Sequence, residues 1–92
     1  MAVRAGVGEG EGVKPLYLIR HARNKARHWR ISQAEIEEAI ATPAATTPSV
    51  GNRVNCWHRW RGAWLRVTIE EQIDRMLVIT VTPRRTGPEG HR

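Results

Sequence analysis

The last third of the chain alternates apolar and polar residues in the way typical of β-strands. Leu77, Ile79 and Val81 are separated by other residues, and residues 65–69 show the same period of two. Side chains along a strand point alternately to the two faces of a sheet, so Leu77, Ile79 and Val81 are expected on one face. The pattern predicts three strands joined by short hairpin turns. They cover about 53–59, 63–71 and 76–82, and Pro83 is expected to end the last one.

Two helices are predicted before these strands. The first covers about 16–29 and carries one narrow apolar stripe with helical spacing, formed by Leu18, Ala22, Ala26 and Trp29. The second begins with Ser32 and Glu35, which fit a capping box. It ends before Pro43, because the residue before a proline avoids the helical conformation. Residues 42–52 are expected to form a loop.

This order of elements predicts a small α+β domain. Two N-terminal helices are expected to pack on one face of a three- to four-stranded antiparallel sheet. We expect residues 1–15, with alternating glycines, to be a disordered segment and residues 16–85 to be the domain. Residues 86–92 are expected to be a flexible basic tail.

The net positive charge of the chain favours a negatively charged partner. The chain of 92 residues has a net charge of +6 and a pI near 11.0, and 13 of its 15 cations are arginine. Arginine suits bidentate phosphate contacts and stacking on bases, although a generic basic surface gives the same totals. The single Cys56 excludes an intrachain disulfide and a cysteine-based zinc site. No membrane-spanning stretch or signal peptide is evident, so we expect a cytoplasmic protein.

Four segments carry a resemblance, and they follow one another in a fixed order. They are His21-Ala22 with Lys25, Ile31-Ser32 through Glu35-Ile36 to Pro43, Leu65-Arg66-Val67 with Glu70-Glu71, and Leu77 to Pro83. Together they resemble a family of small uncharacterised domains related to the RelE/ParE and BrnT toxins. The resemblance spans about residues 18–85. In one departure, Trp29-Arg30 stands where the family often has Arg-Gly.

The resemblance implies a RelE-like fold, which is shared by metal-independent ribonucleases, gyrase poisons and domains without activity. Cleavage of RNA without a metal needs a general base, a general acid and cations that stabilise the charged phosphorus. His21 is the candidate for proton transfer, Arg66 for the phosphate clamp and Thr80 for orienting a phosphate oxygen. Each residue also has an ordinary structural interpretation. His21 can be a packing histidine, Arg66 can pair with Glu70 or Thr80 across the sheet, and Thr80 can be a common β-branched strand residue.

A second set of residues is predicted to bind nucleic acid. Basic side chains of the first helix are expected to position the backbone, and the aromatic and basic residues of the first predicted strand are expected to stack on unpaired bases. The set comprises Arg23, Lys25, Arg27, Trp57, His58 and Arg59. A domain without Phe must also use some Trp in its core, so one of Trp57 and Trp60 is expected to be buried.

The leading hypothesis is therefore a RelE-like toxin domain that cleaves RNA, including mRNA on the ribosome, and is held inactive by an acidic antitoxin. Neither a metal nor a cofactor is expected, because the histidines and Glu35 lack ligand spacing. The alternative is a non-catalytic module of the same fold that binds nucleic acid or a protein partner. A domain retained only to pair with a neighbouring protein is a third interpretation.

Overall fold

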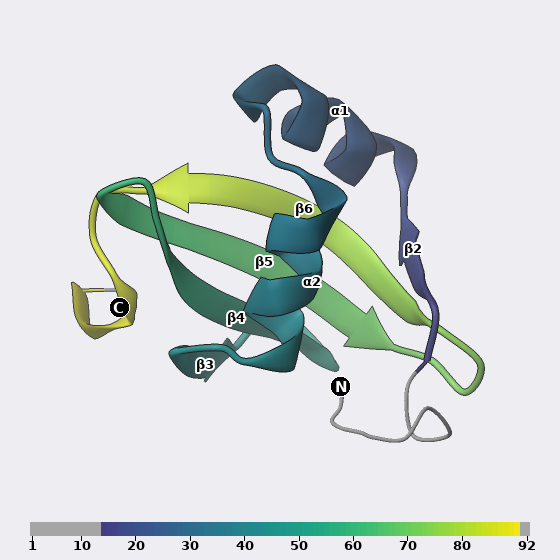
Figure 1. Ribbon diagram of the computed structural model, residues 1–92. Coiled ribbons are helices and arrows are strands. Elements are labelled where there is room, and N and C mark those ends of the chain that lie inside the picture. Colours follow the sequence, from purple (N-terminus) through teal and green to yellow (C-terminus); the bar gives the residue numbers. More distant parts are fainter. Residues whose placement is uncertain (1–13, 91–92) are drawn as a thin grey trace.

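The computed structural model describes residues 14–90, which form one layer of strands covered on one side by helices (Figure 1). The elements are β2 (Leu16–Leu18), α1 (Arg20–Trp29), α2 (Gln33–Ala41), β3 (Ala45–Pro48), β4 (Arg53–Trp60), β5 (Ala63–Glu71), β6 (Met76–Arg84) and the 3-10 helix η2 (Pro88–Gly90). The strand order is β2-β6-β5-β4-β3, with β2 parallel to β6 and the other pairs antiparallel.

The domain is α+β, but the predicted arrangement is wrong in three respects. The sheet has five strands, it is mixed rather than antiparallel, and a strand precedes the two helices. The sequence pattern places β2 in the first helix, because a segment of three residues is too short to distinguish the alternation of a strand from the spacing of a helix. Backbone hydrogen bonds at both its ends tie it to β6, from Met76 N to Pro15 O (2.9 Å) and from Ile19 N to Val78 O (3.3 Å).

The predicted loop 42–52 contains the short edge strand β3, which pairs with β4 along Ala45 to Pro48. The disordered segment predicted for 1–15 lies outside the described residues except for Lys14 and Pro15. Lys14 Nζ donates to Glu71 Oε2 at 2.7 Å. The predicted flexible tail is described as far as residue 90, and there η2 contacts β3.

A bulge in β6 changes which residues face the helices. Val81 pairs with Val67 and Val78 pairs with Ile69, so two residues of β6 oppose one residue of β5 between these pairs. Ile79 is the additional residue. Val78 and Val81 are therefore both fully buried beneath the helices, and the predicted grouping of Ile79 with Val81 on one face is wrong. Strict alternation could not reveal this, because a bulge breaks the period of two.

β6 also runs through Pro83 to Arg84, where the sequence predicted its end. Pro83 pairs with Leu65 of β5. β2 covers the other side of β6 only along Met76 to Val78. At Pro83 no strand within residues 14–90 pairs with that side of β6, so the missing N–H interrupts no ladder there.

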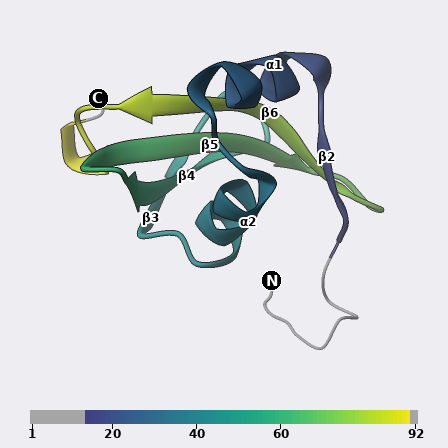
Figure 2. The same ribbon diagram turned by 45° about the horizontal axis from the view of Figure 1, so that its top comes forward.

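Both helices lie on the same side of the sheet, which we call the helix face (Figure 2). The core there combines Ala22 and Ala26 of α1 with Ile36 and Ala39 of α2, over sheet residues that include Cys56, Leu65, Val67, Val78 and Val81. The opposite side of the sheet carries Asn55, Trp57, Arg66, Thr68 and Thr80, and neither α1 nor α2 covers it; we call it the open face.

The predicted capping box of α2 is confirmed. Ser32 Oγ accepts a hydrogen bond from Glu35 N at 3.1 Å, and Ser32 N donates to Glu35 Oε1 at 2.8 Å. Ile31 and Ile36 occupy the positions of a hydrophobic staple around this cap, and both are buried in the core. Local sequence signals therefore determine where α2 begins and which side of it is buried.

Ile36→Ala is expected to lower the free energy of unfolding by about 2–5 kcal/mol, because it leaves a cavity under α2. Ile36 is completely buried, whereas Ile73 in the β5–β6 turn is 96% exposed. The matched change Ile73→Ala is expected to alter stability by no more than about 0.5 kcal/mol. Urea unfolding followed by circular dichroism measures both values. Equal effects of the two changes would contradict the packing of α2 described above.

Candidate anion-binding site

The open face presents its polar side chains in rows across β4, β5 and β6. Each row consists of residues that pair directly across the three strands. In order along the sheet, the rows are Arg59–Trp64–Arg84, Trp57–Arg66–Thr82, Asn55–Thr68–Thr80 and Arg53–Glu70–Leu77. Successive rows lie about 6.6 Å apart, because two residues of a strand separate them. Three of these rows contain an arginine, and the Asn55–Thr68–Thr80 row lies between two of them.

A hollow of about 460 Å³ opens on this face beside the β3–β4 turn. Its lining consists of Pro48, Ser49, Val50, Arg53, Asn55, Arg66, Thr68, Ile79 and Thr80. Arg66 and Thr80, two of the three predicted catalytic residues, therefore converge on one site. The bulge at Ile79 places Thr80 directly across from Thr68.

Arg66 is the most unusual group in the hollow. Its Nε is fully buried and has no hydrogen-bond partner among the described residues. Burial, and to a smaller extent the charge of Arg84, lowers the pKa of the Arg66 guanidinium, which nevertheless stays protonated in proteins. The sequence suggested Glu70 as its partner, but Glu70 Oε1 accepts from Arg53 Nε at 3.2 Å instead. The positive charge of Arg66 thus has no carboxylate partner within residues 14–90.

A chain of hydrogen bonds fixes the floor of the hollow. Thr68 Oγ1 donates to Asn55 Oδ1 at 2.7 Å, and Asn55 Nδ2 donates to Thr47 Oγ1 at 3.2 Å. Trp57 Nε1 donates to the same threonine oxygen at 3.0 Å. Asn55 and Thr68 are buried polar residues, so these bonds satisfy groups that would otherwise destabilise the sheet. Strand register brings them together, and no motif in the sequence identifies them.

His21, the third predicted catalytic residue, does not reach this hollow. It lies exposed on α1, and α1 packs on the helix face of the sheet. Arg66 and Thr80 point to the open face, so the sheet separates the imidazole from both. The sequence places His21 correctly on a helix, but it does not specify which face of the sheet that helix covers.

The predicted nucleic-acid-binding residues divide between the same two sides. Arg23, Lys25 and Arg27 lie on α1, while Trp57 and Arg59 lie on the open face. Trp57 is completely buried, so its ring is not available for stacking on a base. This agrees with the expectation that one of Trp57 and Trp60 is buried.

The C-terminal residues cover the end of the open face that holds Trp64. A Cβ added to Gly87 would lie 2.5 Å from the Trp64 indole, which shows how closely the backbone approaches the ring. The Arg59 guanidinium lies 4.9 Å from the centre of the same ring. The open surface therefore begins beside this covered end and continues into the hollow.

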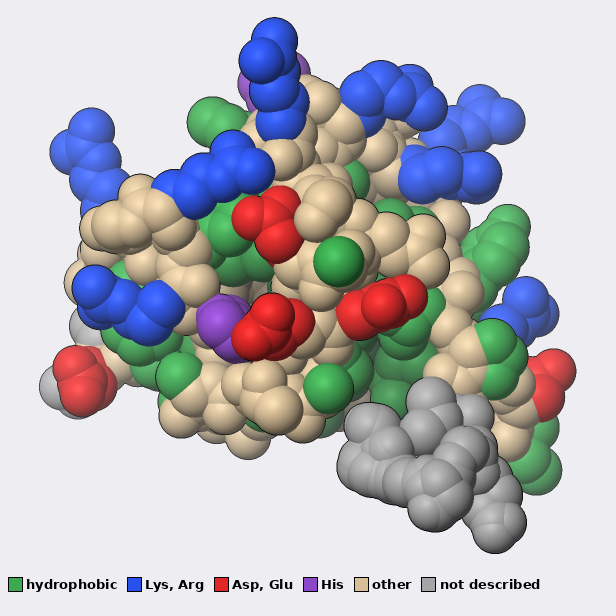
Figure 3. Space-filling view, in the orientation of Figure 1, with side chains coloured by type: hydrophobic (Ala, Val, Ile, Leu, Met, Phe, Trp, Pro, Cys, Tyr) green, Lys and Arg blue, Asp and Glu red, His purple; other side chains and the backbone are tan. Residues whose placement is uncertain are grey.

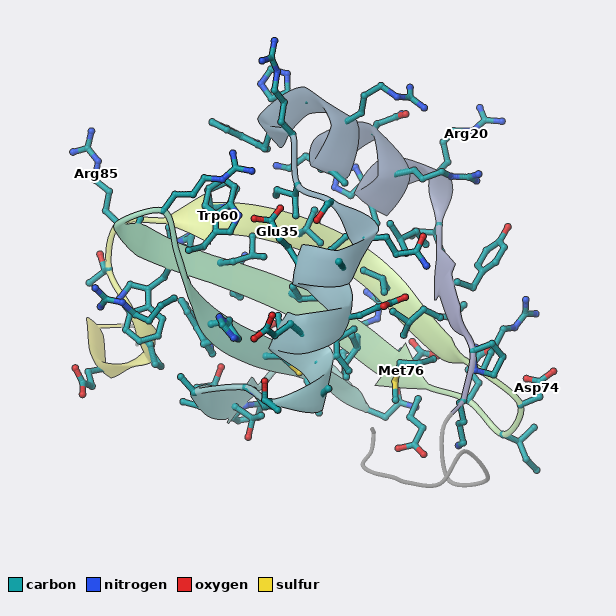
Figure 4. All side chains as sticks on the ribbon, in the orientation of Figure 1. Arg20, Glu35, Trp60, Asp74, Met76 and Arg85 are labelled. Carbon is teal, nitrogen blue, oxygen red and sulfur yellow. The ribbon has the colours of Figure 1, made fainter. Side chains whose placement is uncertain are left out.

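His58 belongs to a separate cluster between α2 and the end of β4. Trp60 Nε1 donates to Glu35 Oε2 at 3.0 Å, and these two side chains lie side by side in Figure 4. His58 Nδ1 lies 2.9 Å from the carbonyl oxygen of Arg59, which can only accept, so Nδ1 carries the proton. Nε2 faces Glu38 at 3.8 Å. These contacts fasten α2 to the sheet.

Cys56 is not placed as a nucleophile. The residue is buried on the helix face, and burial raises the pKa of its thiol to about 11. Within residues 14–90, no three His, Cys, Asp or Glu side chains are grouped as metal ligands. In the same part of the chain, no helix is long and apolar enough to cross a membrane.

Comparison of the chain with protein-family models, with curated proteins and with solved structures finds no match. The function is therefore inferred from the geometry of the hollow and the charges around it.

Glu35 predicts a pH dependence of stability. The Ser32 backbone hydrogen bond, with smaller contributions from Trp60 and Arg61, lowers the pKa of Glu35 below its ordinary value of 4.5. A carboxylate with a depressed pKa stabilises the fold above its unfolded-state pKa, and this stability is lost as the pH falls through the folded-state value. Glu35→Gln should therefore reduce the loss of unfolding free energy between about pH 5 and pH 3. Glu37→Gln is the control, and identical pH profiles for both variants and the wild type would refute the prediction.

Proposed function

We propose that the protein is a non-catalytic nucleic-acid-binding module whose open face binds the phosphate backbone of RNA. The observation that carries this proposal is the Arg66 guanidinium, which is held in an open hollow without a carboxylate partner among residues 14–90. It lies 6.0 Å from the centre of the Trp57 ring, and a bound anion would compensate its partly buried charge more fully. Phosphate oxygens fit, because a guanidinium presents several N–H donors in a fixed plane.

The surroundings of Arg66 favour an extended polyanion over a single small anion. Arg53 lines the same hollow, and Arg84 is close enough to Arg66 to lower its pKa. Arg59 continues the series at the covered end of the face. These four arginines occupy three of the four rows, so several phosphate groups along one strand can contact them. Thr80 and Ser49 add hydroxyl groups at the rim of the hollow.

The hollow supports binding better than catalysis. Its described lining contains no His, Asp, Glu, Lys, Tyr or Cys. These are the side chains that transfer protons in general acid–base catalysis. An electrostatic clamp is present, but the proton-transfer pair that metal-free RNA cleavage needs is not among the lining residues.

Arg66→Gln is expected to weaken the binding of a single-stranded RNA by about tenfold or more, as a lost charge-assisted contact implies. The slope of log K against log salt concentration should fall by about 0.7. Fluorescence anisotropy with a labelled RNA measures both quantities. Arg75→Gln removes the same charge beside Asp74, in the β5–β6 turn and outside the lining of the hollow, and serves as the control.

Thr80→Val provides a second variant that keeps the shape of the side chain while removing its hydroxyl. It is expected to weaken RNA binding less than Arg66→Gln does. Unchanged affinity in Arg66→Gln, with a wild-type unfolding midpoint, would exclude the hollow as the binding site.

A RelE-like ribonuclease toxin is the second candidate function, and it is favoured by the convergence of Arg66 and Thr80. In that case an acidic antitoxin protein is the expected partner. Its catalytic acid or base has to come from outside the described lining of the hollow, since His21 lies on the other side of the sheet.

Cleavage separates the two functions. We expect full-length RNA to remain intact after prolonged incubation with the purified protein, and bacteria that express the protein to grow at the same rate as bacteria that express Arg66→Gln. Gel electrophoresis and growth curves provide the readouts. RNA fragments or growth arrest that disappear in Arg66→Gln would favour the ribonuclease, and loss of the effect in His21→Ala would restore the predicted role of His21.

A further inference from the structure

α1 presents a continuous stripe of arginine on the side of the molecule opposite the hollow. Three arginines, Arg20, Arg23 and Arg27, follow a helical spacing of three and four residues and share one side of α1. Arg30 adds a fourth at the C-cap, where its backbone is left-handed. All four are exposed, because Ala22 and Ala26 form the buried side of α1. The stripe is about 15 Å long at 1.5 Å per residue. We call it the arginine stripe.

No carboxylate neutralises the arginine stripe within residues 14–90. None of its four side chains takes part in an ion pair there, and α1 itself contains no acidic residue. The nearby Glu35 is already engaged by Arg61, Trp60 and the Ser32 backbone. Figure 3 shows the basic side chains gathered over α1 and the acidic ones over α2.

The N-terminus of α1 is unfavourable for helix stability, in contrast to that of α2. Ile19 occupies the N-cap without a side-chain hydrogen bond, and the first turn contains Arg20 and no acidic residue. A positive charge at a helix N-terminus opposes the helix dipole, and a missing cap costs about 1 kcal/mol. α2 has the complete capping box and acidic residues. Local rules of this kind are most often broken where a surface serves a function.

We propose that the arginine stripe is a second nucleic-acid backbone surface, separate from the hollow, so that one molecule contacts two nucleic-acid segments from opposite sides. The helices and the sheet lie between the two surfaces. A strand bound in the hollow therefore contacts the stripe only through a second segment that passes around the domain. Binding by the stripe does not depend on the open face; if the hollow binds nothing, the stripe remains a nucleic-acid surface and only the two-sided contact is lost.

Trp29 distinguishes a nucleic acid from an acidic protein segment as the partner. Its side chain is 43% exposed at the C-terminal end of α1, where it precedes Arg30 in the sequence, and the His28 ring packs against it edge-on with centroids 5.0 Å apart. An exposed indole at the end of a basic helix can stack on an unpaired base. The stripe therefore offers both phosphate contacts and one stacking position.

The test compares two double variants with the same loss of charge. Arg23→Gln/Arg27→Gln alters the stripe, whereas Arg75→Gln/Arg85→Gln alters charges away from it; Arg85 projects outward at one end of the sheet and Asp74 marks the turn at the other (Figure 4). With a labelled RNA of about twenty nucleotides, the stripe variant is expected to bind about tenfold more weakly at low salt, with a salt slope reduced by about 1.4. The control should stay within about twofold of the wild type.

Combination with Arg66→Gln tests whether the two surfaces are separate. If they are, the fold-losses of the stripe variant and of Arg66→Gln multiply in the triple variant. Wild-type affinity and salt slope in the stripe variant would overturn the stripe proposal while leaving the hollow untouched. Polyglutamate is compared with unlabelled RNA of equal charge as a competitor for the labelled RNA. If polyglutamate displaces the labelled RNA from the stripe more strongly, the stripe proposal is also overturned, because an acidic protein would then be the fitting partner. Unfolding midpoints confirm that each variant is folded.

Discussion

The pairing of β5 with β6 across the bulge at Ile79 determines the chemistry of both sides of the sheet. On one side it buries Val78 and Val81 together under the helices. On the other it aligns Thr80 with Thr68 and Thr82 with Arg66. If the same sequence paired with β5 without the bulge, one end of β6 would shift by a residue, and every side chain beyond that point would then face the opposite layer. The hydrophobic core and the hollow thus depend on the same single irregularity.

The two helices have opposite electrostatic roles. α2 follows the rules for a stable helix end, and its contacts through Glu35 and Glu38 fasten it to β4. α1 concentrates uncompensated positive charge and is held mainly by two small buried side chains, Ala22 and Ala26. Small residues let a helix approach the sheet closely while its charged side chains stay in solvent. α2 therefore contributes stability, whereas α1 contributes an exposed charged surface.

Features that depend on local signals could be predicted from the sequence. The capping box at Ser32, the stop at Pro43 and the bounds of β5 follow from a few neighbouring residues, and the structure has each of them. β2 and β3 were missed because three or four residues carry too little periodicity. The bulge at Ile79 was missed for a related reason, since one extra residue leaves the composition of the strand unchanged.

The candidate site was predicted only in part, because a site combines residues that are distant in sequence. Arg66 and Thr80 were assigned to neighbouring strands and do share a face. Asn55 and Thr68 became visible only through the register of β4 and β5. The predicted partnership of His21 with Arg66 depended on the side of the sheet that α1 covers. That side is decided by packing across the whole domain, and no short motif encodes it.

The parallel pairing of β2 with β6 has a consequence for the order of assembly. Leu16 and Met76 are about sixty positions apart along the chain, whereas β4, β5 and β6 are joined by tight turns. Closing a long loop costs more entropy than closing a hairpin, and contacts of high sequence separation slow folding. The meander can therefore form first and serve as a template, and the N-terminal strand docks last along its edge.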